Sequence, residues 1–89
     1  MASVDLSNQA KKAYERIARS DPRLLARIDR ALDDLAENPA LGKPLHGPFA
    51  DMRSLRVGPL RVVYSWEADR LLVFVVNIGQ RGEVYRVRG

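Results

Sequence analysis

The fold is decided by a stretch in the second half of the chain, residues 60–78, which reads LRVVYSWEADRLLVFVVNI. Its first part alternates apolar and other residues, and its second part is an almost unbroken apolar run; both patterns are typical of β-strands. The dipeptide Ala68–Asp69 separates the two parts, and so short a connection joins antiparallel neighbours. The stretch therefore predicts strands at Leu60–Glu67 and Leu71–Ile78, the second of them central and buried on both faces.

Further strands are predicted on either side of this pair. Arg53–Val57 precedes it across the turn Gly58–Pro59, and Glu83–Val87 follows it across the glycine-containing segment 79–82. A short strand at Ala2–Leu6 is a further candidate to pair onto the sheet. The second half of the chain, residues 52–87, is thus expected to form a three- to four-stranded antiparallel sheet.

The first half of the chain has helical periodicity. Apolar or small residues recur at helical spacing in residues 7–19 and 25–35, which predicts a helical hairpin over about residues 7–37. Asp21 and Pro22 mark the restart, because aspartate caps helices well and proline is favoured at the first helical position. Residues 38–50 contain three Pro and two Gly, so they are expected to form an irregular connection, held to the body by its apolar side chains.

Together these elements predict one α+β domain over residues 1–89, a helical hairpin packed on an antiparallel sheet. A chain of 89 residues has no room for a Rossmann or barrel enzyme. The absence of cysteine excludes disulfide scaffolds, cysteine zinc sites and thiol nucleophiles. No apolar run approaches the roughly 20 residues of a membrane span. A cytoplasmic protein without cofactor or metal, and not bound to a membrane, is expected.

The charge is distributed unevenly along the chain. Residues 1–42 hold seven Lys/Arg and seven Asp/Glu, whereas residues 43–89 hold eight and four, so the second half carries the whole net charge of +4. A basic excess on one structural half indicates a polyanion or an acidic protein as partner. A merely solvated surface is the alternative reading of the same charges.

The usual catalytic motifs are absent from the sequence, and arginines on the predicted strands remain as candidates. In Leu60–Glu67 the alternation places Arg61 on the face opposite Leu60, Val62 and Tyr64. Arg56 likewise alternates with its apolar neighbours. Both arginines are expected on the open face of the sheet, where a planar guanidinium suits phosphate.

The stretch from residue 41 to residue 86 resembles the C-terminal half of the RelE/ParE superfamily of type II toxins, in particular its RelE branch. The matching pieces, in family order, are GKPL at 42–45 with Gly47, SLRVG at 54–58, RVVY at 61–64, GQR at 79–81 and EVYR at 83–86. The resemblance implies a toxin kept silent by a cognate antitoxin, which cuts mRNA in the ribosomal A site without metal, and which contacts operator DNA only through the antitoxin.

The resemblance also implies particular site residues. Arg61, Arg81 and Tyr85 correspond to the catalytic residues of the family; the arginines would stabilise the phosphorane and the phenol would orient or deprotonate the 2′-hydroxyl. The residues that we expect to bind RNA are Lys43, Arg53, Arg56 and Arg86. His46 is a candidate acid or base, since histidine is the residue type that titrates near neutral pH, and an ordinary loop residue otherwise.

The sequence departs from the family pattern in front of the Leu-Arg element. Well-studied RelE-type enzymes carry two lysines there, and Met52 and Ser54 stand at these positions in this chain. An arginine hardly gives up its proton, so the neighbouring arginines replace the charge but not the acid-base function. Two alternatives therefore stay open: an inhibitor of DNA gyrase, as in the ParE branch, and a toxin homologue that only binds its antitoxin.

Overall fold

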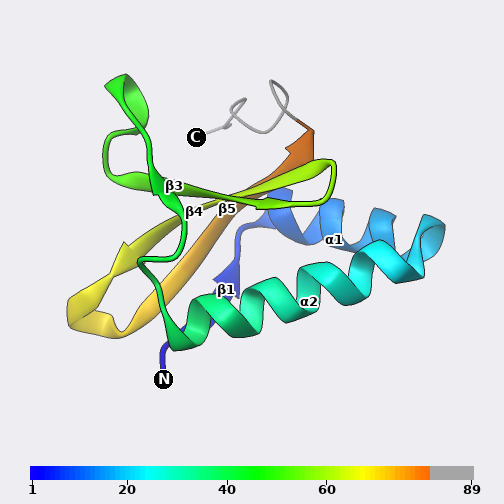
Figure 1. The fold of residues 1–89 in the computed structure, drawn as a ribbon, viewed down its shortest axis with the longest axis horizontal. Helices are drawn as coiled ribbons and strands as arrows, with labels where there is room; N and C mark the ends of the chain where they lie inside the picture. Colours follow the sequence, from blue (N-terminus) through cyan, green and yellow to red (C-terminus); the bar gives the residue numbers. More distant parts are fainter. Residues whose placement is uncertain (81–89) are drawn as a thin grey trace.

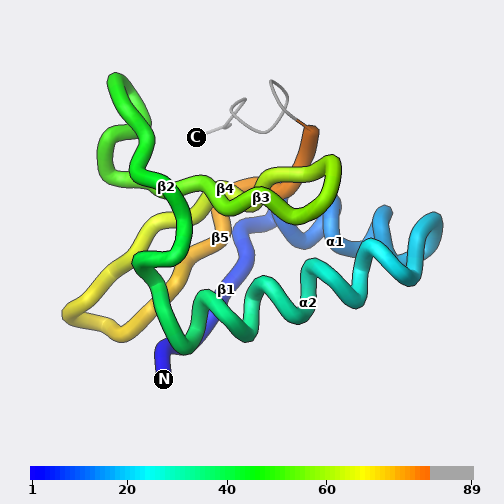
Figure 2. Tube along the Cα trace, in the orientation of Figure 1, coloured from blue at the N-terminus to red at the C-terminus, as the bar shows by residue number. Residues whose placement is uncertain are grey.

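The computed structural model describes residues 1–80, in which two helices cover one face of a twisted sheet (Figure 1). The chain starts in a short strand, passes through both helices and then builds the rest of the sheet (Figure 2). The elements are β1 (Ser3–Leu6), α1 (Asn8–Ser20), α2 (Pro22–Glu37), β2 (Lys43–Pro44), the 3-10 helix η1 (Gly47–Phe49), β3 (Met52–Val57), β4 (Leu60–Glu67), the 3-10 helix η2 (Ala68–Arg70) and β5 (Leu72–Gln80).

Both helices begin at the residues that the sequence indicates. The Ser7 side chain caps α1 by accepting a hydrogen bond from Ala10 N–H at 3.0 Å. Asp21 ends α1 and caps α2, since its N–H donates to Ile17 O and its carboxylate accepts from Leu24 N–H at 3.1 Å. Such a shared cap leaves no room for a loop, so the two helices form a tight hairpin.

The sheet of the described residues has five strands in the order β1-β5-β4-β3-β2. Strands β2 to β5 are antiparallel to their neighbours, whereas β1 runs parallel to β5. A parallel neighbour requires a crossover, and here the chain between β1 and β5 includes both helices. The predicted α+β domain, a helical hairpin packed on a sheet whose second-half strands are antiparallel, is confirmed. The number of strands differs from the predicted three or four, and β1, whose direction the sequence left open, runs parallel.

The central strand is also different from the prediction. With β1 on the outside, β4 becomes the middle strand and β5 lies next to the edge. The sequence of β5 is the most apolar of the strands, and this predicted a central position. Apolar content indicates that both faces of a strand are buried, which holds for β5, but it does not determine the order of the strands in the sheet. The predicted strand Glu83–Val87 lies outside the described residues.

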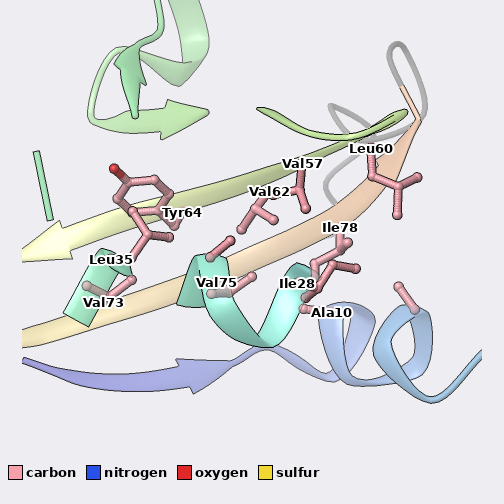
Figure 3. Packing of buried hydrophobic residues seen from close by; sticks show 12 residues of the cluster. Ala10, Ile28, Leu35, Val57, Leu60, Val62, Tyr64, Val73, Val75 and Ile78 are labelled. Atoms are coloured by element: carbon pink, nitrogen blue, oxygen red, sulfur yellow. The ribbon is translucent and has the colours of Figure 1, made fainter. Parts of the chain in front are cut away.

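One hydrophobic core lies between the helices and the sheet (Figure 3). Ile28 and Leu35 from α2 and Ala10 from α1 are completely buried there. They pack with side chains of β3, β4 and β5, which are Val57, Leu60, Val62, Tyr64, Val73, Val75 and Ile78. Burial of a Leu or Ile side chain stabilises the fold by about 1.5–3 kcal/mol. The helices of the described residues are not long and apolar enough to cross a membrane.

Candidate functional site

The two faces of the sheet differ in chemistry because successive side chains of a strand point to opposite faces, and apolar and polar residues alternate in β3 and β4. Leu60, Val62 and Tyr64 of β4 point to the helices, as predicted, and Arg61 points to the other face. In β3 the same alternation sends Leu55 and Val57 to the core and Ser54 and Arg56 to the face opposite the helices. We call this second surface the open face.

Arg56 and Arg61 are direct cross-strand partners on the open face. Side chains of such a pair start about 5 Å apart, so their guanidinium groups repel each other. Arg56 Nε donates to Gly58 O at 3.4 Å, a long bond that leaves the rest of the group available. The one ion pair found within residues 1–80 joins Arg70 to Glu67, away from this site. An anion between the two arginines would remove the repulsion.

A cavity of about 160 Å³ lies beside this pair. It is lined by both arginines and by the turn residues Gly58, Pro59 and Leu60. The turn is tight because Gly58 takes a left-handed conformation with φ of 57°, which glycine adopts without strain. The turn thus holds two cations beside a space large enough for a phosphate group.

The structure adds Lys43 to this face. Lys43 of β2 pairs with Ser54 of β3, which precedes Arg56 by two residues and therefore lies on the same face. The Lys43 side chain is exposed. Of the residues assigned to RNA binding from the sequence, the structure therefore brings Lys43 and Arg56 together with Arg61. We call these three residues the cationic face.

Arg53 does not belong to the cationic face. It pairs with Tyr64 across the strands, so it lies on the side of the helices. Its guanidinium donates to Gly42 O at 2.8 Å and to Ala40 O at 3.3 Å. These bonds join Arg53 to the connection between α2 and β3. Arg53 precedes Ser54 in β3, and successive residues of a strand point to opposite faces, so Arg53 lies on the face opposite Ser54. The structure gives Arg53 a role in holding this connection.

Tyr64 also attaches the connection to the sheet, a role that no pattern in the sequence indicates. Its hydroxyl donates to Pro39 O at 2.6 Å and accepts from Gly42 N–H at 2.9 Å. In Figure 3 its oxygen points away from the aliphatic core. Gly42 is required here, because a Cβ at this position would lie 2.7 Å from Tyr64 Oη. Burial raises the pKa of Tyr64, and the Gly42 hydrogen bond and the charge of Arg53 partly oppose this.

These polar bonds attach the connection, and of the apolar side chains that the sequence predicted to hold it, Leu45 and Phe49 are half-buried. Leu41 is 45% exposed, so it does not anchor the connection. The segment is also less irregular than predicted, since it contains β2 and η1. In Figure 1, η1 lies on the side of the sheet away from α2.

Ser54 is an unusual residue on the open face. It is 6% exposed, and its Oγ has no hydrogen-bond partner. Its neighbour Val63 is completely buried, and Asn77 in the same row is 5% exposed. A buried hydroxyl without a partner is uncommon and costs free energy. This hydroxyl therefore has unused hydrogen-bonding capacity next to its register partners Lys43 and Val63.

The other predicted site residues are not part of this constellation. His46 is exposed and precedes η1, where its carbonyl accepts from Phe49 N–H at 3.4 Å. Arg81, Tyr85 and Arg86 lie outside the described residues. Within residues 1–80, His, Asp and Glu side chains form no group of three that could hold a metal ion.

A second cavity lies between α2 and β3 and has a volume of about 320 Å³. Its apolar floor includes Leu41, Leu55 and Val57, and cations stand at its rim. The lining residues are Arg27, Arg30, Ala31, Asp34, Leu41, Leu55, Arg56 and Val57. Arg56 belongs to this cavity and to the cationic face, so the two surfaces are continuous.

Comparison with known proteins gives a consistent result. Residues 4–85 match the family model described as the ParE toxin of the type II toxin-antitoxin system parDE. The toxin RelG of Mycobacterium tuberculosis is 33% identical over 67 residues, which are 73% of this chain and 77% of RelG.

Solved structures have the same fold. The RelBE2 toxin-antitoxin complex of Mycobacterium tuberculosis contains a similar chain, with a TM-score of 0.78 and 26% identity over 90% of this chain and 98% of that chain. A chain of the intact Escherichia coli RelBE complex matches with a TM-score of 0.73 and 21% identity, over 90% and 96% of the two chains. The second similarity concerns the fold alone.

Proposed function

The chain belongs to the RelE/ParE superfamily of type II toxins, and on this basis we propose that it is a metal-independent endoribonuclease that cuts mRNA in the ribosomal A site. The observation that carries the proposal is the Arg56–Arg61 couple on the open face, which makes no ion pair within residues 1–80. Two guanidinium groups held beside one cavity fit a phosphodiester and its transition state.

The reaction is a transesterification by the RNA itself. The 2′-oxygen attacks the adjacent phosphorus, the bond to the 5′-oxygen breaks, and a 2′,3′-cyclic phosphate forms. Negative charge accumulates on the equatorial oxygens of the phosphorane, so fixed donors next to them accelerate the reaction. Arg56 and Arg61 take this role, with Arg81 assigned to it by its position in the family motif. Tyr85 is assigned to the 2′-hydroxyl on the same ground.

The test is expression in a host without the antitoxin, with growth and mRNA 5′ ends followed together. Wild type is expected to stop growth and to produce new ends inside translated messages. Arg61→Ala should reduce the cleavage rate about 10²–10³-fold, the usual effect of removing one transition-state donor. Arg70→Ala is the matched control, since Arg70 is an exposed arginine of η2, between β4 and β5, and has an ion pair of its own. Equal activity of both variants would contradict the proposal.

A second function is favoured by the matched family model, which is that of ParE. In this reading the cationic face contacts DNA gyrase and does not cut RNA. Growth arrest with intact mRNA and with gyrase-dependent DNA breaks would establish this alternative. Absence of growth arrest, with antitoxin binding retained, would identify a homologue that only binds its antitoxin.

We propose that a cognate antitoxin is the partner in the cell, as in the solved complexes of relatives. The cavity between α2 and β3 offers an apolar floor, and three of its rim residues are arginines. A segment that carries apolar side chains on one side and carboxylates on the other is complementary to it. Leu55→Glu should weaken the complex, whereas Glu67→Gln on the far end of β4 should leave it unchanged; isothermal titration calorimetry measures both.

A further inference from the structure

The proposed cleavage needs a proton as well as positive charge. When the bond between phosphorus and the 5′-oxygen breaks, that oxygen becomes a strongly basic alkoxide unless an acid protonates it. Arg56 and Arg61 do not supply this proton, because a guanidinium stays protonated in proteins. The donor has to be another side chain within reach of the cationic face.

Lys43 is placed for this task by two independent features of β2. Its register partner is Ser54, which lies on the open face. In addition, the missing Cβ of the preceding Gly42 would point at Tyr64, on the helix side of the sheet. Since successive residues of a strand point to opposite faces, Lys43 points to the open face. The other lysines of the chain, Lys11 and Lys12, lie on α1, which packs on the opposite side.

The distances between these positions permit a shared substrate. Strands lie about 4.8 Å apart and residues rise about 3.4 Å along a strand, so Lys43 and Arg61, two strands and two residues apart, have Cα atoms about 12 Å apart. Extended Lys and Arg side chains each reach roughly half that distance. Both can contact one phosphodiester between them, with the lysine on one side of the phosphorus and the arginines on the other.

Ser54 supports the same assignment. Its buried Oγ lacks a partner and lies beside Lys43 in the β2–β3 register. A hydroxyl in this place can accept a hydrogen bond from the ammonium group of its register neighbour, whereas its shielded oxygen does not reach the substrate itself. It would hold the Lys43 side chain on this face, and the bond would satisfy an oxygen that is otherwise buried without compensation.

We infer that Lys43 is the general acid that protonates the 5′-oxygen leaving group, an inference that rests on the proposed endoribonuclease function. As the bond from phosphorus to the 5′-oxygen breaks, its electron pair goes to that oxygen, which takes a proton from the Lys43 ammonium group. The neutral amine then takes a proton from water. Ser54 is a positioning residue that acts through Lys43.

The experiment compares two substrates in ribosomes programmed with a defined message. One message has the natural phosphodiester in the A-site codon, and the other has sulfur in place of the bridging 5′-oxygen. A thiolate leaves without a proton, so an enzyme that lacks only its general acid cleaves the sulfur substrate at the normal rate. The variants are Lys43→Ala, Lys43→Arg and Ser54→Ala, with Lys11→Ala on α1 as the matched lysine control and His46→Ala as a test of the competing candidate acid. Circular dichroism checks that each variant is folded.

Removal of a general acid slows a reaction about 10²–10⁴-fold. Lys43→Ala and Lys43→Arg are expected to lose this factor on the oxygen substrate and to come within about threefold of wild type on the sulfur substrate. Ser54→Ala should show the same pattern with a smaller loss, and Lys11→Ala should match wild type on both substrates.

Three results would overturn the inference. Equal losses on both substrates would mean that Lys43 acts through charge alone. Full activity of Lys43→Arg would show that no proton is needed from this position. A loss in His46→Ala that the sulfur substrate restores would assign the acid to His46. If wild type cuts neither message, the proposed function itself fails, and the inference fails with it.

Discussion

Tyr64→Phe removes a single oxygen atom on which the connection between α2 and β3 depends. The ring stays in the core, so no cavity forms there. What disappears is the acceptor for Gly42 N–H at 2.9 Å and the donor to Pro39 O at 2.6 Å. Arg53 still binds Gly42 O and Ala40 O, and Leu45 N–H still donates to Met52 O.

The expected cost follows from the burial of these groups. The bond to Gly42 is buried and the bond to Pro39 is partly buried. A buried donor or acceptor left without a partner costs about 1–3 kcal/mol, and water reaches the Pro39 carbonyl more easily, so we expect a loss of about 2–3 kcal/mol in the free energy of unfolding. For a domain of this size, this lowers Tm by about 8–20 °C.

Urea unfolding followed by circular dichroism measures this loss, with Tyr14→Phe as the matched control. The Tyr14 hydroxyl also makes a short bond, 2.6 Å to Asp29 Oδ1, but at an exposed position between the helices. Its removal should cost about 0.5–1.5 kcal/mol. If Tyr64→Phe is no more destabilising than Tyr14→Phe, then the tyrosine does not hold the connection. Because β2 carries Lys43, Tyr64→Phe should also reduce RNA cleavage in the folded protein.

Three further predictions concern pH, backbone conformation and charge. Burial raises the pKa of Tyr64 above its ordinary value of 10.0, so the contribution of its hydroxyl to stability is complete below pH 10 and falls as pH rises further. The free energies of unfolding of wild type and Tyr64→Phe, measured by chemical denaturation between about pH 8 and 11, should therefore converge at the alkaline end. Gly58→Ala should lower the free energy of unfolding by about 1–2 kcal/mol, since φ is 57° and the new Cβ would lie 2.9 Å from Arg27 Nη1; thermal unfolding with an unchanged Tm would contradict this. Arg61→Gln should reduce the proposed RNA cleavage about 10²–10³-fold yet raise stability by about 0.2–0.5 kcal/mol at low salt, because it removes the repulsion with Arg56, and the gain should shrink at high salt.

Local chemistry explains the parts of the fold that the sequence predicted well. The cap at Ser7, the shared cap at Asp21 and the proline at the start of α2 act within one helical turn, so they can be read from neighbouring residues. The strand Leu60–Glu67 was predicted with its observed bounds, and alternation placed Arg61 on the correct face. Such signals depend on the spacing of residues along the chain and not on which helix or strand packs against them.

The same kind of signal was insufficient for β1. Four residues in a strand pattern do not reveal whether they pair parallel or antiparallel, because that choice depends on where the helical hairpin returns the chain. Because β1 pairs beside β5, β5 is the second strand of the sheet and β4 is the middle one. The sequence groups Lys43, Arg53 and Arg56 as candidate RNA-binding residues, but the alternation in β3 places Arg53 on the opposite face from the other two.

The sequence by itself determined the two helices, the strands β3, β4 and β5, the two faces of β4 and the membership of the toxin superfamily, since each depends on local periodicity or on motifs in order. Only the tertiary structure decided that Tyr64 and Arg53 hold residues 38–45 and that β2 brings Lys43 beside Ser54. These contacts join residues 11 to 25 positions apart in the chain. Hydrogen bonds and register over such separations depend on how the strands pair, and no spacing pattern in the sequence records that pairing.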